Sequence, residues 1–127
     1  MAEAVLDSSA VLAFLRGETG ADRVAPRLAT SVVSAVNYTE IISRLIDFGS
    51  AADAAVLSAR ELNMQVRPLD ALGAADAGAL RATTKSRGLS LGDRACLALG
   101  KRLGLPVYTA DRAWAELDLG VEVVLIR

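Results

Sequence analysis

The sequence predicts an α/β domain in which a mainly parallel sheet of four or five strands is flanked by helices. Short apolar runs of strand length alternate along the chain with longer segments whose apolar residues recur at helical spacing. The chain has 127 residues, of which 53% are hydrophobic, and this is ample for a substantial core. No internal repeat, low-complexity tract or linker divides it, so we expect a single domain over residues 1–127.

The first half of the chain predicts two strands and four helices. Pro26 makes the interior of the second helix doubtful, because proline lacks the backbone N–H that a helix uses. Ser34 is placed to cap the third helix, which has an apolar stripe along one face. The strands are expected at residues 4–7 and 29–33, and the helices at residues 11–15, 19–28, 35–48 and 50–64.

The second half predicts three more strands and three more helices. Pro68 favours an edge or an end of the first of these strands. Ser90 is a suitable N-cap for a helix that Gly104 and then Pro106 close. The strands are expected at residues 65–69, 106–110 and 121–126, and the helices at residues 70–85, 91–103 and 112–117.

The composition excludes several kinds of catalysis. The chain has no histidine, which excludes Ser-His-Asp and Cys-His catalysis, imidazole-driven RNA cleavage and histidine-ligated zinc or iron. The single cysteine, Cys96, excludes an internal disulfide and a multi-cysteine zinc site, and a small buried hydrophobe is its expected role. Any hydrolysis would fall to carboxylates, most simply with a hard cation such as Mg²⁺ or Mn²⁺.

Charge and hydropathy give weaker indications. The net charge of −1 provides no overall attraction to nucleic acid. Of the 14 basic residues only Lys85 and Lys101 are lysines, and arginine suits phosphate, although the base composition of a genome can also favour arginine. No apolar run approaches the ~20 residues of a membrane span, and the first residues do not resemble a signal peptide. We therefore expect a cytoplasmic protein without a membrane partner.

Four acidic residues occupy comparable places in the predicted fold. Asp7 and Asp111 each end a strand, whereas Glu40 and Asp93 lie early in helices. In a parallel sheet, ligands bind beyond the carboxyl ends of the strands, where the strand order reverses. Four carboxylates gathered there would repel one another and raise some of their pKa values unless a cation neutralised them. The pattern therefore indicates a metal site.

Each acid also has a purely structural interpretation. Ser90 and Asp93 have the spacing of a capping box, and Asp7 could be an N-cap. Glu40 could pair with Arg44 four residues later, a surface interaction worth only ~0.3 to 0.5 kcal/mol. Polar residues near the acids could support them or serve as ordinary caps. Asn37, one helical turn before Glu40, could orient that carboxylate, and hydroxyl groups near the acids are those of Ser8, Ser9 and Thr109.

Four segments resemble, in order and spacing, the motifs of the PIN domain and more narrowly of the VapC toxins of bacterial type II toxin-antitoxin pairs. Each motif alone is weak, but four in register within 127 residues are specific, and the resemblance covers nearly the whole chain. The segments are VLDSSAVL at residues 5–12, NYTE at 37–40, LSLGDRACLA at 89–98 and YTADRAW at 108–114.

The resemblance implies a Mg²⁺- or Mn²⁺-dependent endoribonuclease that cuts single-stranded loops of tRNA, ribosomal RNA or messenger RNA. It implies that the metal-binding acids are Asp7, Glu40, Asp93 and Asp111, and that Thr109 accompanies the fourth acid. It also implies a homodimer and a cognate antitoxin that occupies an apolar groove. Groove candidates, about half of which could instead be core residues, are Ile41, Ile42, Leu45, Ile46, Val56 and Leu57.

Other functions remain open. A haloacid-type phosphatase is disfavoured because Asp-x-Asp would follow its first strand, whereas here Asp7 is followed by two serines. A response-regulator receiver needs adjacent acids near its first strand and a lysine after its last core strands, and neither is evident. An RNA-processing PIN nuclease without a toxin role, or a noncatalytic PIN module that binds RNA or protein, is the remaining alternative.

Overall fold

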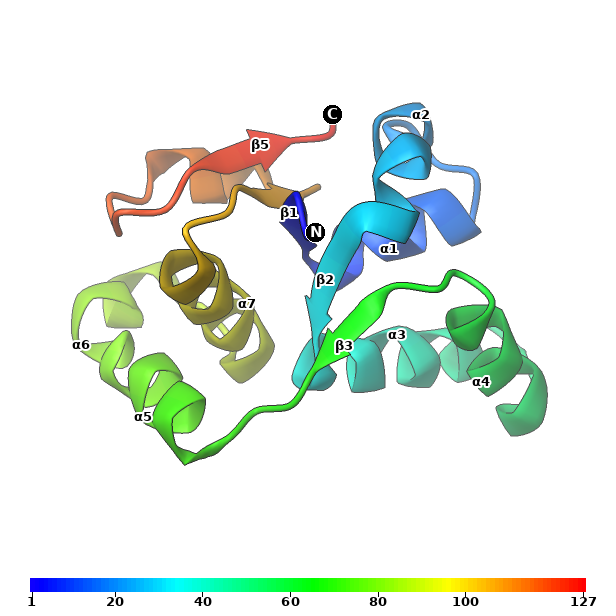
Figure 1. Ribbon diagram of the computed structural model, residues 1–127, viewed down its shortest axis with the longest axis horizontal. Helices are drawn as coiled ribbons and strands as arrows, with labels where there is room; N and C mark the ends of the chain where they lie inside the picture. The colour runs from blue at the N-terminus through cyan, green and yellow to red at the C-terminus, as the bar shows by residue number, and fades with distance from the viewer.

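The computed structural model describes residues 1–127 and contains one five-stranded sheet whose neighbouring strands are all parallel. The strand order is β3-β2-β1-β4-β5, which places β1 at the centre (Figure 1). The predicted α/β class is therefore confirmed, and the sheet is wholly parallel. In chain order, β1 to β5 are Ala4–Leu6, Ser31–Ser34, Gln65–Arg67, Val107–Thr109 and Val123–Leu125.

Helices cover both faces of the sheet. Figure 1 shows α1 to α4 on one side of it and α5 to α7 on the other. None of the helices is long and apolar enough to cross a membrane. The α-helices α1 to α7 are Ser8–Leu15, Ala21–Val24, Ala35–Asp47, Ala52–Arg60, Ala71–Ala79, Arg81–Thr84 and Leu91–Leu103, and the 3-10 turns η1 to η3 are Ala25–Thr30, Lys85–Arg87 and Arg112–Glu116.

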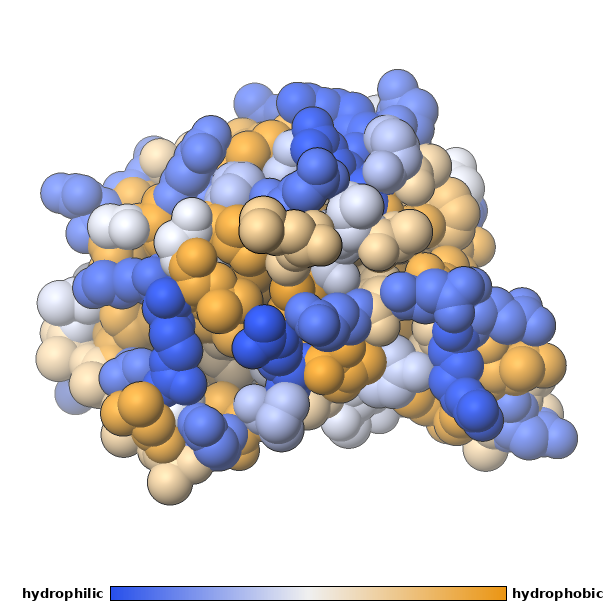
Figure 2. All heavy atoms as spheres, in the orientation of Figure 1, coloured by the Kyte–Doolittle hydropathy of each residue, from blue (hydrophilic) through white to orange (hydrophobic).

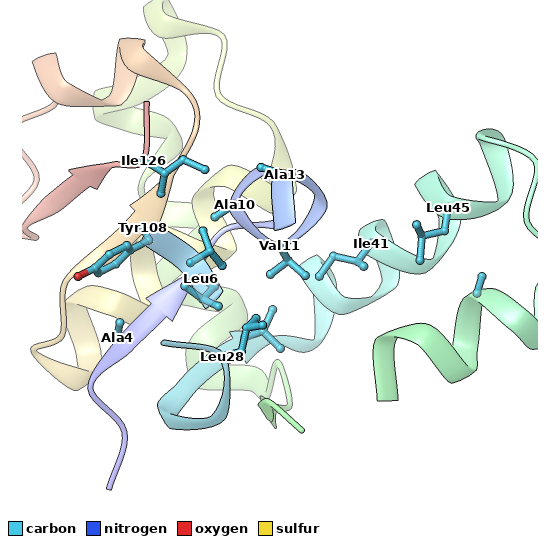
Figure 3. Packing of buried hydrophobic residues seen from close by; sticks show 13 residues of the cluster. Ala4, Leu6, Ala10, Val11, Ala13, Leu28, Ile41, Leu45, Tyr108 and Ile126 are labelled. Carbon is cyan, nitrogen blue, oxygen red and sulfur yellow. The ribbon is translucent and has the colours of Figure 1, made fainter. Parts of the chain in front are cut away.

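The core follows from the alternation of side chains along the central strand. Leu6 points into the larger hydrophobic cluster, where it packs with residues of α1 and α3 (Figure 3). Val5 points to the opposite face and joins Cys96 and Trp114 in a second cluster. Burial raises the pKa of the Cys96 thiol well above its ordinary value, which makes this cysteine an inert core residue, as predicted.

Two predicted helices are interrupted. The helix expected at 19–28 is a short α2 followed by a 3-10 turn, because Pro26 at the start of that turn has no N–H to continue the α-helical ladder. The helix expected at 70–85 breaks after α5. The Leu80 carbonyl there accepts the backbone N–H of Thr83 as well as that of Thr84, and it also accepts both threonine hydroxyls, so the chain tightens locally toward 3-10 geometry.

Candidate active site

The strand order places the ends of β1 and β4 side by side at the centre of the molecule. Leu6 pairs with Tyr108, and the Asp7 backbone N–H donates to the Tyr108 carbonyl at 2.9 Å. From β1 the sheet extends through β2 and β3 in one direction, and through β4 and β5 in the other. Asp7 and Thr109 thus lie at the reversal of strand order, where α/β folds bind ligands.

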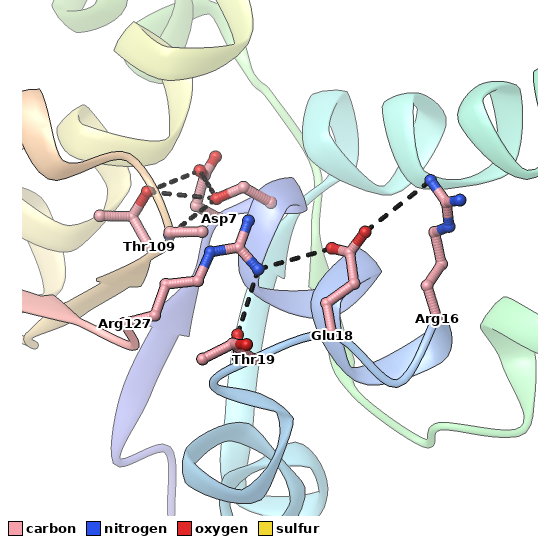
Figure 4. A network of polar contacts seen from close by, with 8 residues as sticks. Asp7, Arg16, Glu18, Thr19, Thr109 and Arg127 are labelled. Carbon is pink, nitrogen blue, oxygen red and sulfur yellow. Dashed lines mark hydrogen bonds and ion pairs between the residues drawn. The ribbon is translucent and has the colours of Figure 1, made fainter.

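Two hydroxyl groups hold the Asp7 carboxylate from opposite ends of the chain. Ser9 Oγ donates to Asp7 Oδ2 at 2.6 Å and Thr109 Oγ1 donates to the same oxygen at 2.9 Å (Figure 4). Each hydroxyl also accepts a backbone N–H, from Ala110 at 2.9 Å and from Asp111 at 3.0 Å respectively. These N–H groups orient the hydroxyl protons toward Asp7, so the carboxylate is fixed through one oxygen.

The other oxygen of this carboxylate, Asp7 Oδ1, is buried and has no hydrogen-bond partner. Asp7 is only 3% exposed, and burial is the largest cause that raises its pKa from 3.8 to about 6. The hydrogen bonds from Ser9 and Thr109 lower the pKa, whereas the charges of Asp93 and Glu40 raise it further. A buried carboxylate with one free oxygen, in the field of two other acids, is suited to hold a cation.

Glu40 is positioned on α3 by an asparagine and against α7 by a glycine. Asn37 Nδ2 donates to Glu40 Oε1 at 2.8 Å and to the Gly92 carbonyl at 3.2 Å, which joins the two helices. A Cβ at position 92 would lie 2.6 Å from Glu40 Cδ, so the Glu40 carboxylate occupies space that only glycine leaves open. The alternative pairing of Glu40 with Arg44 is wrong, because Glu40 makes no ion pair in the structure.

Asp93 and Asp111 both use a carboxylate oxygen at the start of a helical segment. Asp93 Oδ2 accepts the Ser90 N–H at 2.9 Å and Ser90 Oγ accepts the Asp93 N–H at 3.1 Å, which is the capping box expected from the sequence. Asp111 Oδ1 accepts the Ala113 N–H at 3.0 Å at the start of η3. The second carboxylate oxygen of each residue makes no hydrogen bond and is available to a ligand.

The structure brings three of the four acids into electrostatic contact. Glu40 and Asp93 both influence the pKa of Asp7, whereas Asp111 is linked to Asp7 only through the Thr109 hydroxyl. No three acidic or cysteine side chains converge closely enough to hold a metal ion between them. The carboxylates stay apart because like charges repel one another. Those of Glu40, Asp93 and Asp111 each accept a hydrogen bond from a donor in their own segment.

A cleft between α1 and α3 opens beside these acids. The residues that line the cleft include Ser8, Ser9, Glu40, Arg16, Arg44 and Phe48. The sequence does not identify the arginines or the phenylalanine, since exposed arginines and a phenylalanine at a helix end are common on protein surfaces.

Gly92 is a site residue that the sequence could have indicated. A glycine within a helix costs about 1 kcal/mol relative to alanine, and its presence therefore suggests that another group approaches the backbone closely.

The residues proposed to line an apolar groove fall into two groups. Ile41 and Leu45 are 0% and 8% exposed and belong to the core, which is the alternative that the sequence left open (Figure 3). Ile42 is partly buried against the same cluster. The other three candidates are exposed: Ile46 near the carboxyl end of α3, and Val56 and Leu57 on α4. Figure 2 shows apolar atoms interspersed with hydrophilic ones over α4, at the lower right of the view.

Comparison with known proteins identifies the fold. In structure, the chain resembles one chain of the DNA-bound VapBC from Salmonella typhimurium, with a TM-score of 0.74, 19% identity and 100% of both chains covered. It also resembles one from a toxin-antitoxin complex of Klebsiella pneumoniae, with a TM-score of 0.77, 18% identity and 98% of both chains covered. A third similar chain is from VapBC-5 of Mycobacterium tuberculosis, with a TM-score of 0.59 and 23% identity, covering 100% of this chain and 99% of the other.

No curated protein sequence matches the chain. The family model described as "PIN domain", however, matches residues 4–119, a span that contains all four acids, both hydroxyls on Asp7 and the glycine under Glu40. The chain belongs to the PIN domain family.

Proposed function

We propose that the protein is an endoribonuclease that requires Mg²⁺ or Mn²⁺ and acts as the toxin of a toxin-antitoxin pair. The observation that carries the proposal is the Asp7 carboxylate, which is buried, fixed through Oδ2 and free at Oδ1, with Glu40 and Asp93 near enough to raise its pKa. This donor set consists of oxygens, which hard divalent cations prefer. Asp7, Glu40, Asp93 and Asp111 are the residues that would hold the ion, provided that the three outer carboxylates turn from their local donors toward Asp7 Oδ1 when it binds.

The chemistry assigned to the site is hydrolysis of a phosphodiester bond. A bound divalent cation lowers the pKa of water and stabilises negative charge on a phosphoryl oxygen. Ser9 and Thr109 keep the Asp7 carboxylate in one orientation, so that it need not reorganise when a ligand binds. Asn37 does the same for Glu40, and Ser8 lies where the cleft meets the acids.

The toxin role is supported by the fold and by the character of the similar structures. The three similar structures described above come from VapBC or other toxin-antitoxin systems, and they match this chain over nearly its whole length. By analogy, a cognate antitoxin would bind the exposed apolar residues Ile46, Val56 and Leu57, and the protein would form a homodimer. Sedimentation analysis of the purified protein tests the dimer directly.

The first experiment measures cleavage of unpaired RNA by the purified protein in Mn²⁺ and in EDTA. We expect cleavage only with the metal, and its loss in Glu40→Gln, which removes a charge from the site. Glu122→Gln is the matched control, because Glu122 is exposed and makes no ion pair. Cleavage that persists in EDTA would contradict the metal-dependent mechanism.

A growth assay separates the toxin from its two alternatives. Expression of the wild-type protein should arrest bacterial growth, and the Glu40→Gln variant should not. An RNA-processing nuclease would cleave RNA in vitro without arresting growth, and a noncatalytic PIN module would do neither. Arrest by both proteins equally would remove the link between this site and toxicity.

A further inference from the structure

The carboxylate of Glu18 lies between two arginines in the cleft between α1 and α3. Its two oxygens face different guanidinium groups, with Oε2 at 3.9 Å from Arg16 Nη1 and Oε1 at 3.5 Å from Arg127 Nη1 (Figure 4). All three residues line a cleft of about 490 Å³, which Ser9 and Glu40 connect to the candidate active site. A cluster of ion pairs therefore lies in the cleft through which a ligand reaches the acids.

Neither arginine depends on Glu18 for its position. The guanidinium carbon of Arg16 lies 3.5 Å from the centre of the Phe48 ring, and this cation–π contact holds the arginine at the carboxyl end of α3. Arg127 Nη1 donates to the Thr19 carbonyl at 3.1 Å. The two guanidinium groups would therefore keep their places if the Glu18 carboxylate left the space between them.

The contacts of Glu18 with the two arginines are loose. Their lengths of 3.9 and 3.5 Å exceed the range of an N–H···O hydrogen bond, about 2.7 to 3.2 Å. The Glu18 side chain is 40% exposed, and exposed ion pairs contribute little to stability. A competing anion can therefore displace this carboxylate at small cost.

The backbone of Glu18 is fixed, so that only its side chain is free to move. Helix α1 ends in a Schellman motif, in which the Glu18 N–H donates to the Ala13 carbonyl at 2.8 Å and the Gly17 N–H to the Phe14 carbonyl at 3.2 Å. The Glu18 carbonyl in turn accepts the Ala21 N–H at 3.0 Å. Displacement of the carboxylate therefore rotates the side chain toward solvent and leaves α1 intact.

A phosphate group is the anion that matches this position. Like a carboxylate, it presents a pair of oxygens to the N–H groups of arginine. With Glu18 turned away, Glu40 would be the only acid that lines the cleft, together with the three arginines Arg16, Arg44 and Arg127. The space between Arg16 and Arg127 would then be a positively charged site.

We propose that Glu18 is an autoinhibitory residue, whose carboxylate occupies the place of a substrate phosphate between Arg16 and Arg127 until that phosphate displaces it. The inference rests on the proposed ribonuclease function, which makes the phosphate part of an RNA backbone. It adds to that function a limit on affinity that is built into the fold, because an acid of the protein competes with the substrate for the same two arginines.

The test measures binding of inorganic pyrophosphate by isothermal titration calorimetry in metal-free buffer, which separates the competition from cleavage. Glu18→Gln keeps the shape of the side chain and removes its charge. It should bind pyrophosphate roughly fivefold more tightly, which is the effect of one unit charge ~4 Å away in a water-exposed setting. Adding Arg127→Gln to this variant should abolish the gain. Glu122→Gln, at an exposed acid without an ion pair, changes the net charge equally and should alter the affinity less than about twofold.

RNA provides the second arm of the test. In Mn²⁺, Glu18→Gln should lower the KM for RNA roughly fivefold and leave kcat unchanged, because the displaced carboxylate takes no part in the reaction. Circular dichroism confirms that each variant is folded, and Arg16→Gln replaces Arg127→Gln if the latter unfolds.

The direction of the change decides between the two roles that Glu18 could have. Pyrophosphate binding that is unchanged or weaker in Glu18→Gln would overturn the proposal, because a residue that only orients the arginines gives a loss. A gain with pyrophosphate but an unchanged KM would overturn the assignment of the phosphate to RNA and leave a site for free phosphate. A wild-type protein that never cuts RNA would refute the proposed function instead, whatever the calorimetry shows.

Discussion

Replacing Asp7 by asparagine should stabilise the metal-free protein at neutral pH. Burial raises the pKa of Asp7 from 3.8 to about 6, so the fold disfavours the charged carboxylate relative to the unfolded chain. Between these two values the folded protein binds more protons than the unfolded one, and stability therefore falls as the pH rises through this window. One pKa unit corresponds to about 1.36 kcal/mol, so the ionised carboxylate lowers the free energy of unfolding at pH 7 by roughly 3 kcal/mol.

Asparagine removes that charge and keeps the shape of the side chain. The carbonyl oxygen of the asparagine can accept the hydrogen bonds from Ser9 and Thr109. Its NH₂ group takes the place of Asp7 Oδ1, which has no hydrogen-bond partner in the structure. Because an unpaired buried N–H costs about 1 kcal/mol or more, the expected gain at pH 7 is roughly 1 to 2 kcal/mol. In a domain of this size that raises the melting temperature by about 3 to 8 °C.

Urea unfolding in EDTA, followed by circular dichroism at pH 7 and at pH 4, measures this gain. The advantage of Asp7→Asn should disappear at pH 4, where Asp7 of the wild type is protonated. Asp47→Asn, at an exposed carboxyl group without a hydrogen bond or ion pair, should change stability by less than about 0.5 kcal/mol at either pH. A variant less stable than the wild type at pH 7, by the same amount at pH 4, would refute the reasoning.

Three other perturbations address the neighbouring acids and the exposed apolar face. In Gly92→Ala the new Cβ would lie 2.6 Å from Glu40 Cδ and displace that carboxylate, so RNA cleavage should fall roughly 100-fold while the melting temperature stays close to that of the wild type; unchanged cleavage would exclude Glu40 from the reaction. Millimolar Mg²⁺ should raise the melting temperature of the wild type, and Asp93→Asn, whose amide oxygen can still accept the Ser90 N–H, should lose most of that rise; equal shifts would argue against a shared metal site. Ile46→Asp, at a residue 42% exposed, should weaken antitoxin binding about tenfold and spare cleavage, and undiminished binding would place the interface elsewhere.

Periodicity in the sequence predicts the elements of this fold better than their interruptions. The strands that end on Asp7 and just before Asp111 are apparent because short apolar runs stop at a polar residue, and the sheet topology then brings their ends together. Pro26 marks one interruption in advance. The break after α5 carries no such mark, because no proline lies at Leu80 or in the four residues that follow it.

The spacing of residues in the sequence does not decide which of two possible partners a side chain contacts. Glu40 has Asn37 three residues before it and Arg44 four residues after it, and helical geometry permits both contacts. The structure selects Asn37, which also bonds the Gly92 carbonyl, and it places Arg44 beside Phe48. An exposed ion pair is worth a few tenths of a kcal/mol, so tertiary packing against α7 easily determines the outcome.

The hydrogen bond from Thr109 to Asp7 spans 102 positions of the sequence and joins the first strand to the fourth. A ribosome makes Asp7 near the start of synthesis and Thr109 near the end, so the growing polypeptide exposes the first of the four site acids long before that acid can be fixed in place. Nuclease competence would therefore arise abruptly, when β4 docks beside β1, and every shorter nascent fragment would be harmless to the RNA of the machine that is translating it.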